Sequence, residues 1–345
     1  MTDKGWISDN PIEINARPPH AHWLNRGGLK HRWQLKRVLM SVAVLWAAYT
    51  LTFLILYILP SDPVTIMLNQ GEQSTVDLAQ VNALKALYHL DQPFYVQYAW
   101  SLWDVLHFDL GKSIVSGDPV TRLILQALPP TLLLAFCALL LAIIIGGGLA
   151  AGVSVMPAGR MKSALLALPS LGAALPTFWL GLLLLQAFSF SHAWFPAMGN
   201  QGWQSLVLPT LTLAVPTAAT LAQVMSRSLA EVWRRPFIDA LRLKGASTAH
   251  LLWRHVLPNA AIPLLTLTGM IFGHLLAGAV VTETIFSREG LGRLAQGAVS
   301  TQDIPVVQGV VLTAATVFVV VNFVVDLLYP LLDPRLGTVS SGGGK

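Results

Sequence analysis

The chain has 345 residues, of which 54% are hydrophobic and 11% are charged, and its mean hydropathy is +0.60. This composition excludes an ordinary soluble protein and indicates an integral membrane protein. The net charge of +5 is not gathered into a basic, aromatic-interleaved module, so a nucleic-acid partner is excluded as well. The single cysteine, Cys137, excludes a disulfide framework and a cysteine-based metal site.

The N-terminal part of the chain predicts a tail, a membrane span and a long external segment. Residues 1–36 contain prolines and glycines but no apolar run, so we expect a flexible tail rather than a signal peptide. A first span is expected at 38–59. The external segment that follows has about 70 residues, too many for a simple turn, so we expect it to have a fold or task of its own. Residues 37–126 thus form one region, a transmembrane helix and an external loop.

The rest of the chain predicts five more spans. Uncharged apolar stretches at 131–155, 163–190 and 206–226 are each long enough to cross about 30 Å of hydrocarbon. Two more stretches, at about 259–281 and 305–328, bring the total to six. Because membrane helices satisfy their backbone hydrogen bonds internally, we expect an all-α fold, a polytopic membrane helical bundle with six transmembrane helices.

Lysine and arginine residues predict the orientation of these spans. Four of them, Lys30, Arg32, Lys36 and Arg37, precede the first span, and basic residues near short loops tend to stay in the cytoplasm. The even number of spans then places both termini in the cytoplasm, including a tail at 335–345.

A short charged segment, residues 236–258, interrupts the apolar sequence on the predicted cytoplasmic side. Pro236 favours the start of a helix, and Gly245 favours its end in a left-handed conformation. Ser247 is expected to cap a second short helix that runs toward Pro258. The two short helices would meet at a glycine elbow.

The first of these helices offers a candidate docking face. Phe237, Ala240 and Leu241 share one face at helical spacing, which indicates contact with a partner. Packing against the chain's own spans is the alternative. Asp239 and Arg242 lie off this face and are placed to pair with each other or across an interface. An exposed pair contributes little stability, so we assign these two residues to orientation.

Several motifs resemble one family in collinear order. Asp239-Ala240-Leu241, three further residues, Gly245 and then Leu257-Pro258 resemble the EAA loop of ABC-importer permeases, with Asp239 where glutamate is usual. The remaining motifs resemble the peptide and nickel permeases among these importers, and the resemblance covers about residues 35–337. These motifs are LPSDPV (59–64), LDQPFYVQY (90–98), FDLGKS (108–113), DPVTRLILQALPPTLLLA (118–135), PTFWLG (176–181), LPTLTLA (208–214), ETIFSREGLGRL (283–294) and LLDPRLG (331–337).

The resemblance implies the permease subunit of a type I ABC importer in the bacterial inner membrane, with its permease domain at 127–334. It implies a second homologous permease, two cytoplasmic ABC ATPases and an extracytoplasmic solute-binding protein as partners. It also implies no catalytic residue, metal or cofactor in this chain, because ATP is bound by the partner subunits and no phosphate-binding G-x-x-x-x-G-K-[ST] loop is present. The coupling residues it implies are Phe237, Asp239, Ala240, Leu241, Arg242, Gly245, Leu257 and Pro258.

The cargo and the competing function classes stay open at this point. Members of the family carry dipeptides, oligopeptides, or nickel and other metal chelates, and the segments 90–98, 195–203 and 269–286 look slightly nearer the nickel branch. An ion-coupled secondary transporter is the alternative, but it predicts buried charges or inverted repeats, whereas spans two to five have uncharged cores and no duplication is evident. An intramembrane enzyme would require a catalytic motif such as H-E-x-x-H, which the sequence lacks.

Two polar residues of the fifth span are candidates for the pathway or for gating. Glu283 lies near the external end of this span, where a buried acid is functional by default and snorkelling to water is the alternative. His274 is the one histidine within a predicted span. A lone histidine there is more often a helix-packing hydrogen-bond partner than a metal ligand.

Overall fold

The computed structural model describes residues 26–58 and 92–332, and it has no β-strand among them. Residues 1–25 of the predicted tail, the motif at 59–64 and the C-terminal tail lie outside the described residues. The helical elements in chain order are α1 (Arg26–Ile58), α4 (Phe94–Leu106), α5 (Val120–Ala142), the π-helical turn Ile143–Gly147, α6 (Gly148–Val155), α7 (Arg160–Ala174), α8 (Thr177–Leu184), the π-helical segment Leu185–Ser191, α9 (Gln204–Trp233), α10 (Pro236–Leu243), α11 (Thr248–Leu251), the π-helical turn Leu252–Val256, α12 (Leu257–Ile285), α13 (Leu291–Ser300) and α14 (Ile304–Leu332).

The chain divides into two compact units, Met1–Val44 and Leu45–Lys345. The described part of the first unit is the beginning of α1, which is already helical from Arg26, well before the predicted end of the tail at residue 36. All contacts considered below lie within the second unit.

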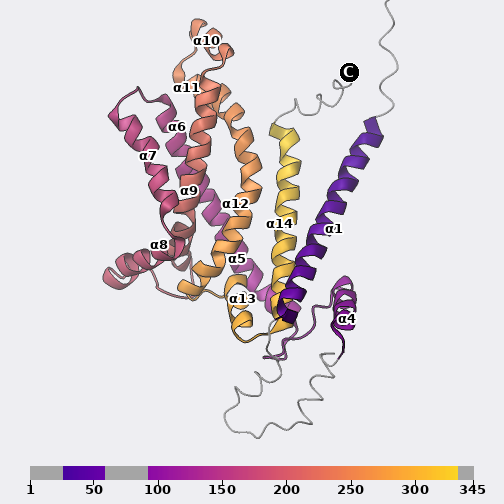
Figure 1. Cartoon of the computed structure of the whole chain (residues 1–345). Coiled ribbons are helices and arrows are strands. Elements are labelled where there is room, and N and C mark those ends of the chain that lie inside the picture. Colours follow the sequence, from indigo (N-terminus) through magenta and orange to yellow (C-terminus); the bar gives the residue numbers. More distant parts are fainter. Residues whose placement is uncertain (1–25, 59–91, 333–345) are drawn as a thin grey trace, which may run out of the picture. The chain divides into compact units, whose positions relative to one another are not determined.

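The core of the second unit is built on α9, which packs against α5, α7 and α12 (Figure 1). Small side chains alternate with leucine and aromatic residues at this junction, and alanines let helix backbones approach closely in a membrane. The fully or largely buried members of this cluster are Leu134, Ala135, Ala138 and Ala142 of α5, Leu213, Ala214, Ala218 and Leu221 of α9, and Ile271, Phe272, Leu275 and Ala279 of α12.

Five described helical segments are long and apolar enough to span a membrane, and a sixth span results if one bent pair is counted as a unit. The expected all-α membrane helical bundle is therefore confirmed, with five spans, or six when the bent pair counts as one. The second span is longer than predicted: it begins at Val120 rather than at Thr131, because the helix runs through Pro129 and Pro130. Prolines are tolerated inside membrane helices when neighbouring groups satisfy the freed backbone atoms.

The bent pair replaces the single straight helix expected at 163–190. Here α7 and the helical stretch that starts with α8 meet at an angle of 96°. Leu175 has an extended backbone with ψ 123°, and Pro176 precedes the first residue of α8. A residue before proline is disfavoured in the helical region, which explains why the helix breaks at this position.

Candidate functional site

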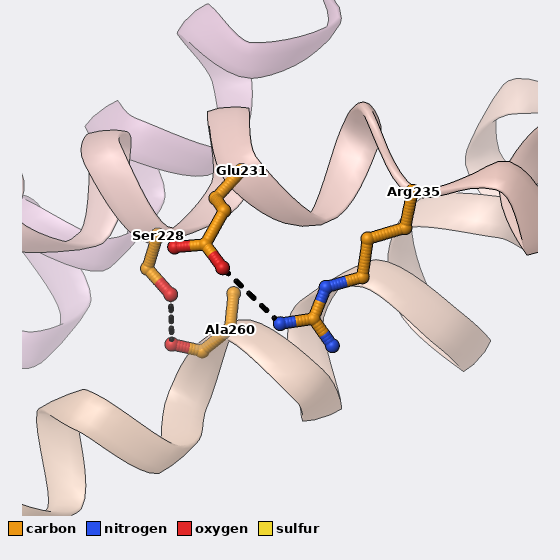
Figure 2. Close-up of polar contacts among 4 residues, drawn as sticks. All are labelled: Ser228, Glu231, Arg235 and Ala260. Atoms are coloured by element: carbon orange, nitrogen blue, oxygen red, sulfur yellow. Dashed lines mark hydrogen bonds and ion pairs between the residues drawn. The ribbon is translucent and has the colours of Figure 1, made fainter.

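The 236–258 segment leaves the bundle between the end of α9 and the beginning of α12, and a hydrogen bond joins these two helices at its base. Ser228 Oγ of α9 donates to the Ala260 carbonyl of α12 over 3.0 Å (Figure 2). Just beyond the end of α9, Arg235 Nη2 lies 3.2 Å from Oε1 of Glu231 in the last turn of α9, but both side chains are exposed. Exposed ion pairs contribute little, so the partly buried hydrogen bond and the packing beside it fix the segment's base.

The helix α10 is anchored by one residue that the sequence pattern did not single out. Ile238 is fully buried in a cluster that includes Leu229, Leu251 and Val256. Leu241 is half-buried and packs against the same cluster. Burying these side chains holds α10 against the ends of α9 and α12. For Leu241 the structure therefore supports the alternative, packing against the chain's own helices.

The opposite side of α10 is open to solvent. Phe237 is 39% exposed and Ala240 is exposed, so two of the three residues predicted for the docking face lie on the open surface. Leu243 is 90% exposed, an unusual state for a leucine beside a well-packed cluster. The spacing of three between Ala240 and Leu243 places them on neighbouring positions of one helix face. The open apolar face of α10 thus consists of Phe237, Ala240 and Leu243.

Gly245 forms the predicted elbow. Its φ angle is +85°, a left-handed conformation that favours glycine. Its N–H donates to the Arg242 carbonyl over 2.9 Å, and the Ala246 N–H donates to the Leu241 carbonyl over 3.2 Å. These bonds satisfy carbonyls that the end of α10 would otherwise leave unpaired.

The second helix of the segment begins as expected but is not short. Ser247 caps it by accepting a hydrogen bond from the His250 N–H over 3.3 Å. The helix then continues through a π-helical turn directly into α12, so the prediction of a separate short helix is wrong. Leu257 and Pro258 are the first residues of α12 and lie directly after the π-helical turn. Any displacement of α10 is consequently linked to a continuous helix that crosses the bundle.

The predicted pair Asp239 and Arg242 forms on the surface. Arg242 Nη1 lies 3.4 Å from Asp239 Oδ1, and both side chains are more than half exposed. The Arg242 guanidinium also lies 5.3 Å from the centre of the Trp233 ring, within the range of a cation–π contact. Arg242 is therefore oriented by the end of α9 as well as by Asp239.

Glu283 is buried at the other end of α12, with an exposed fraction of only 1%. Its Oε1 accepts a hydrogen bond from Thr131 Oγ1 over 2.6 Å, and its Oε2 accepts from the N–H groups of Gly292 and Arg293 over 2.7 and 3.2 Å. Thr131 Oγ1 also accepts from the Leu291 N–H over 2.8 Å. These three N–H groups are the first donors of α13, so Glu283 and Thr131 together cap that helix.

These hydrogen bonds distinguish between the two alternatives for Glu283, a buried acid and a side chain that snorkels to water. The carboxylate does not reach toward water; it joins α5, α12 and α13. Glycine at position 292 allows α13 to approach α12 closely, since a Cβ atom there would collide with the Val280 backbone. The contacts of Glu283 thus fix the start of α13, and its role in gating stays a prediction. His274 is exposed on α12, and no described residue belongs to a group of three or more metal-ligating side chains.

The sequence analysis did not predict a role for two further buried ionic side chains, Arg288 and Asp303. Arg288 is 3% exposed, and its Nη1 donates to the carbonyls of Gly199 and Ser205 over 3.2 and 2.9 Å. Burial lowers the pKa of Arg288, and the charge of Glu283 opposes that shift. Asp303 is also 3% exposed and accepts hydrogen bonds from residues 113–115. Both residues tie loops to the helix ends.

Comparisons with known proteins identify the family. Residues 142–338 match the family model described as the inner membrane component of binding-protein-dependent transport systems. A putative peptide transport system permease protein from Brucella abortus (strain 2308) is 36% identical over 310 residues, which cover 88% of this chain and 98% of the relative. This chain belongs to that family of transport permeases.

Further relatives agree with this assignment. The glutathione transport system permease protein GsiC of Salmonella typhi is 35% identical over 303 residues and is covered to 97%, with 88% of this chain aligned. The inward-facing MetNI methionine ABC transporter has a TM-score of 0.53 and 17% identity, and the match covers 61% of this chain and 97% of that one. This last likeness concerns the fold alone. The chain is a multi-pass, non-catalytic permease subunit of an ABC importer, in which separate subunits hydrolyse ATP and deliver the substrate.

Proposed function

We propose that this permease forms half of the pathway of an ATP-driven importer for small peptides in the bacterial inner membrane. The other half would be a second homologous permease, with two cytoplasmic ATPases and an extracytoplasmic solute-binding protein completing the complex. Both termini and the 236–258 segment would lie in the cytoplasm, as the basic residues before the first span indicate.

The open apolar face of α10 carries the coupling part of this proposal. Leu243 and Phe237 are exposed at the tip of a segment whose base is fixed by Ile238. An exposed apolar face on an otherwise anchored helix is typical of a surface that docks into a groove of a partner. Because the second helix continues into α12, a pull on α10 by the ATPases would move a membrane helix as a rigid body.

The relatives' names guide the choice of cargo. The relative from Brucella abortus is named a putative peptide permease and that from Salmonella typhi a glutathione permease, so we propose a small peptide as cargo. Nickel or a metal chelate, which three sequence segments slightly favoured, stays a prediction. The ligand that co-purifies with the cognate solute-binding protein decides between them: a peptide is expected, and a bound metal chelate would contradict the peptide proposal.

Gly245→Val tests coupling in the reconstituted complex. Valine at φ +85° is strained, so the elbow should distort while the membrane helices still insert. ATPase stimulation by loaded binding protein should fall at least about tenfold, the effect of about 1.4 kcal/mol. Lys244→Val, at an ordinary φ of −80°, is the matched control and should retain stimulation. Normal stimulation of the Gly245 variant would refute the coupling role.

Proteoliposomes separate this proposal from an ion-coupled secondary transporter. Vesicles that contain the permease alone should not accumulate peptide when a proton or sodium gradient is imposed. Vesicles with the complete complex should accumulate it only with ATP. Gradient-driven uptake by the permease alone would support the alternative instead.

A further inference from the structure

A cavity of about 490 Å³ lies beside the base of α10, apart from its open apolar face. It is lined by the end of α6, the first turns of α7, the end of α9 and the 236–258 segment. Three cationic side chains contribute to its wall, Lys162 of α7, Arg234 at the end of α9 and Arg242 of α10. No carboxylate is among the described residues of the lining. The cavity therefore favours an anionic occupant.

The cations reach the cavity from three separate elements. Lys162 is half-buried, and its Nζ donates one hydrogen bond to the Met156 carbonyl over 3.0 Å, which leaves two of its three donors. Arg242 pairs with Asp239 over 3.4 Å, but Asp239 lies outside the lining. An anion bound between these side chains would connect α7, α9 and α10.

An unsatisfied donor points to the same conclusion. The indole N–H of Trp233 is shielded from solvent and has no hydrogen-bond partner. Trp233 lines this cavity, together with the hydroxyl groups of Ser226 and Thr248. Buried donors are nearly always paired, and leaving one unpaired is costly. An oxygen-rich anion in the cavity would accept from Trp233 and from the cations together.

The apolar part of the lining indicates where this anion comes from. Val155, Met156 and Leu166 line the cavity, and they are 42%, 36% and 45% exposed. Val155 is the last residue of a membrane-span candidate, and Leu166 belongs to the bent pair that follows. The cavity is thus at the end of the apolar spans, at the level where lipid headgroups meet acyl chains.

We propose that this cavity binds the phosphate group of an anionic phospholipid, whose acyl chain lies along Val155 and Leu166. Basic pockets between membrane helices are typical binding sites for such headgroups. This lipid would brace the base of α10 against α7. We place this lipid in the cytoplasmic leaflet, which rests on the proposed function, whereas the binding chemistry does not.

Native mass spectrometry of the complete transporter from nanodiscs tests the proposal. Nanodiscs with phosphatidylglycerol should yield one retained lipid for each copy of this permease, and nanodiscs with phosphatidylcholine alone should yield none. The Lys162→Gln/Arg234→Gln variant should weaken retention about tenfold or more, because hydrogen bonds to charged groups are the strong ones. Trp233→Phe removes one neutral donor and should weaken retention a few-fold.

Arg160→Gln is the matched control, since Arg160 is an exposed cation of α7 outside the lining, and it should retain the lipid as the wild type does. Equal retention of both lipids, or equal retention by the double variant and the control, would overturn the proposal. Binding of inorganic phosphate in phosphatidylcholine nanodiscs, without preference for phosphatidylglycerol, would overturn the lipid assignment. Retention needs no ATP hydrolysis, so its failure is distinguishable from failure of the coupling role.

Discussion

Replacing Leu243 with alanine should weaken assembly with the ATPase without destabilising the permease. Leu243 is 90% exposed, so its loss should change the free energy of unfolding of the permease by less than about 0.5 kcal/mol. Full burial of a leucine side chain is worth about 1.5–3 kcal/mol, of which alanine retains a part. A loss of about 1–2 kcal/mol corresponds to about 5- to 30-fold weaker binding of the ATPase.

The assay is a titration of the permease pair in nanodiscs with the ATPase subunit, followed by hydrogen exchange of residues 236–246. Leu243→Ala should weaken binding while exchange stays as in the wild type. Ile238→Ala is the informative contrast, because Ile238 is fully buried and truncation of such a side chain costs about 2–5 kcal/mol. It should accelerate exchange across α10. Wild-type affinity of the Leu243 variant for the ATPase would refute the docking face.

Three further predictions concern the buried ionic side chains, and thermal unfolding in detergent checks each. Glu283→Gln replaces one accepting oxygen with a donor and should cost about 2 kcal/mol, whereas Glu289→Gln, at an exposed site, should cost less than about 0.5 kcal/mol. Arg288→Met leaves two carbonyls without their donor and should cost about 2–3 kcal/mol, with faster proteolysis at 199–205. Asp303→Asn weakens the attachment of the 113–115 loop and should cost about 1–2 kcal/mol. Wild-type stability in any of the three variants would contradict the contact assigned to it.

The backbone of the 236–258 segment was predictable because its signals are local. Proline at a helix start, serine at a cap and glycine in a left-handed position act through the backbone of their own turn. Pro236, Ser247 and Gly245 are found in these roles. Which side of α10 is buried depends instead on where α9 and α12 lie. The helical spacing therefore predicted Leu241 on the open face and did not indicate Leu243.

Proline also shows where a local signal is ambiguous. Pro129 and Pro130 lie inside the continuous helix α5, whereas Pro176 coincides with a bend of 96°. The restriction on the residue before proline applies at each of these positions, so it does not by itself say which proline ends a helix. The hydropathy of 163–190 accordingly predicted one straight span.

Glu283 illustrates the same limit for a polar site. Its position at one end of the fifth span was predicted from the sequence, as was the unusual placement of an acid there. Its partner Thr131 lies 152 positions away, and the donors it caps belong to a helix that was not predicted. Only the packing of three helices distinguishes a buried cap from a snorkelling side chain.

A photo-crosslinking measurement tests the coupling account most directly. A photoreactive phenylalanine analogue replaces Leu243 in the complete transporter, and a second variant carries it at Leu171, which is 67% exposed on α7. The account predicts a crosslink from position 243 to the ATPase subunit and none from position 171. A crosslink from position 243 to the external solute-binding protein, or to lipid alone, would contradict it.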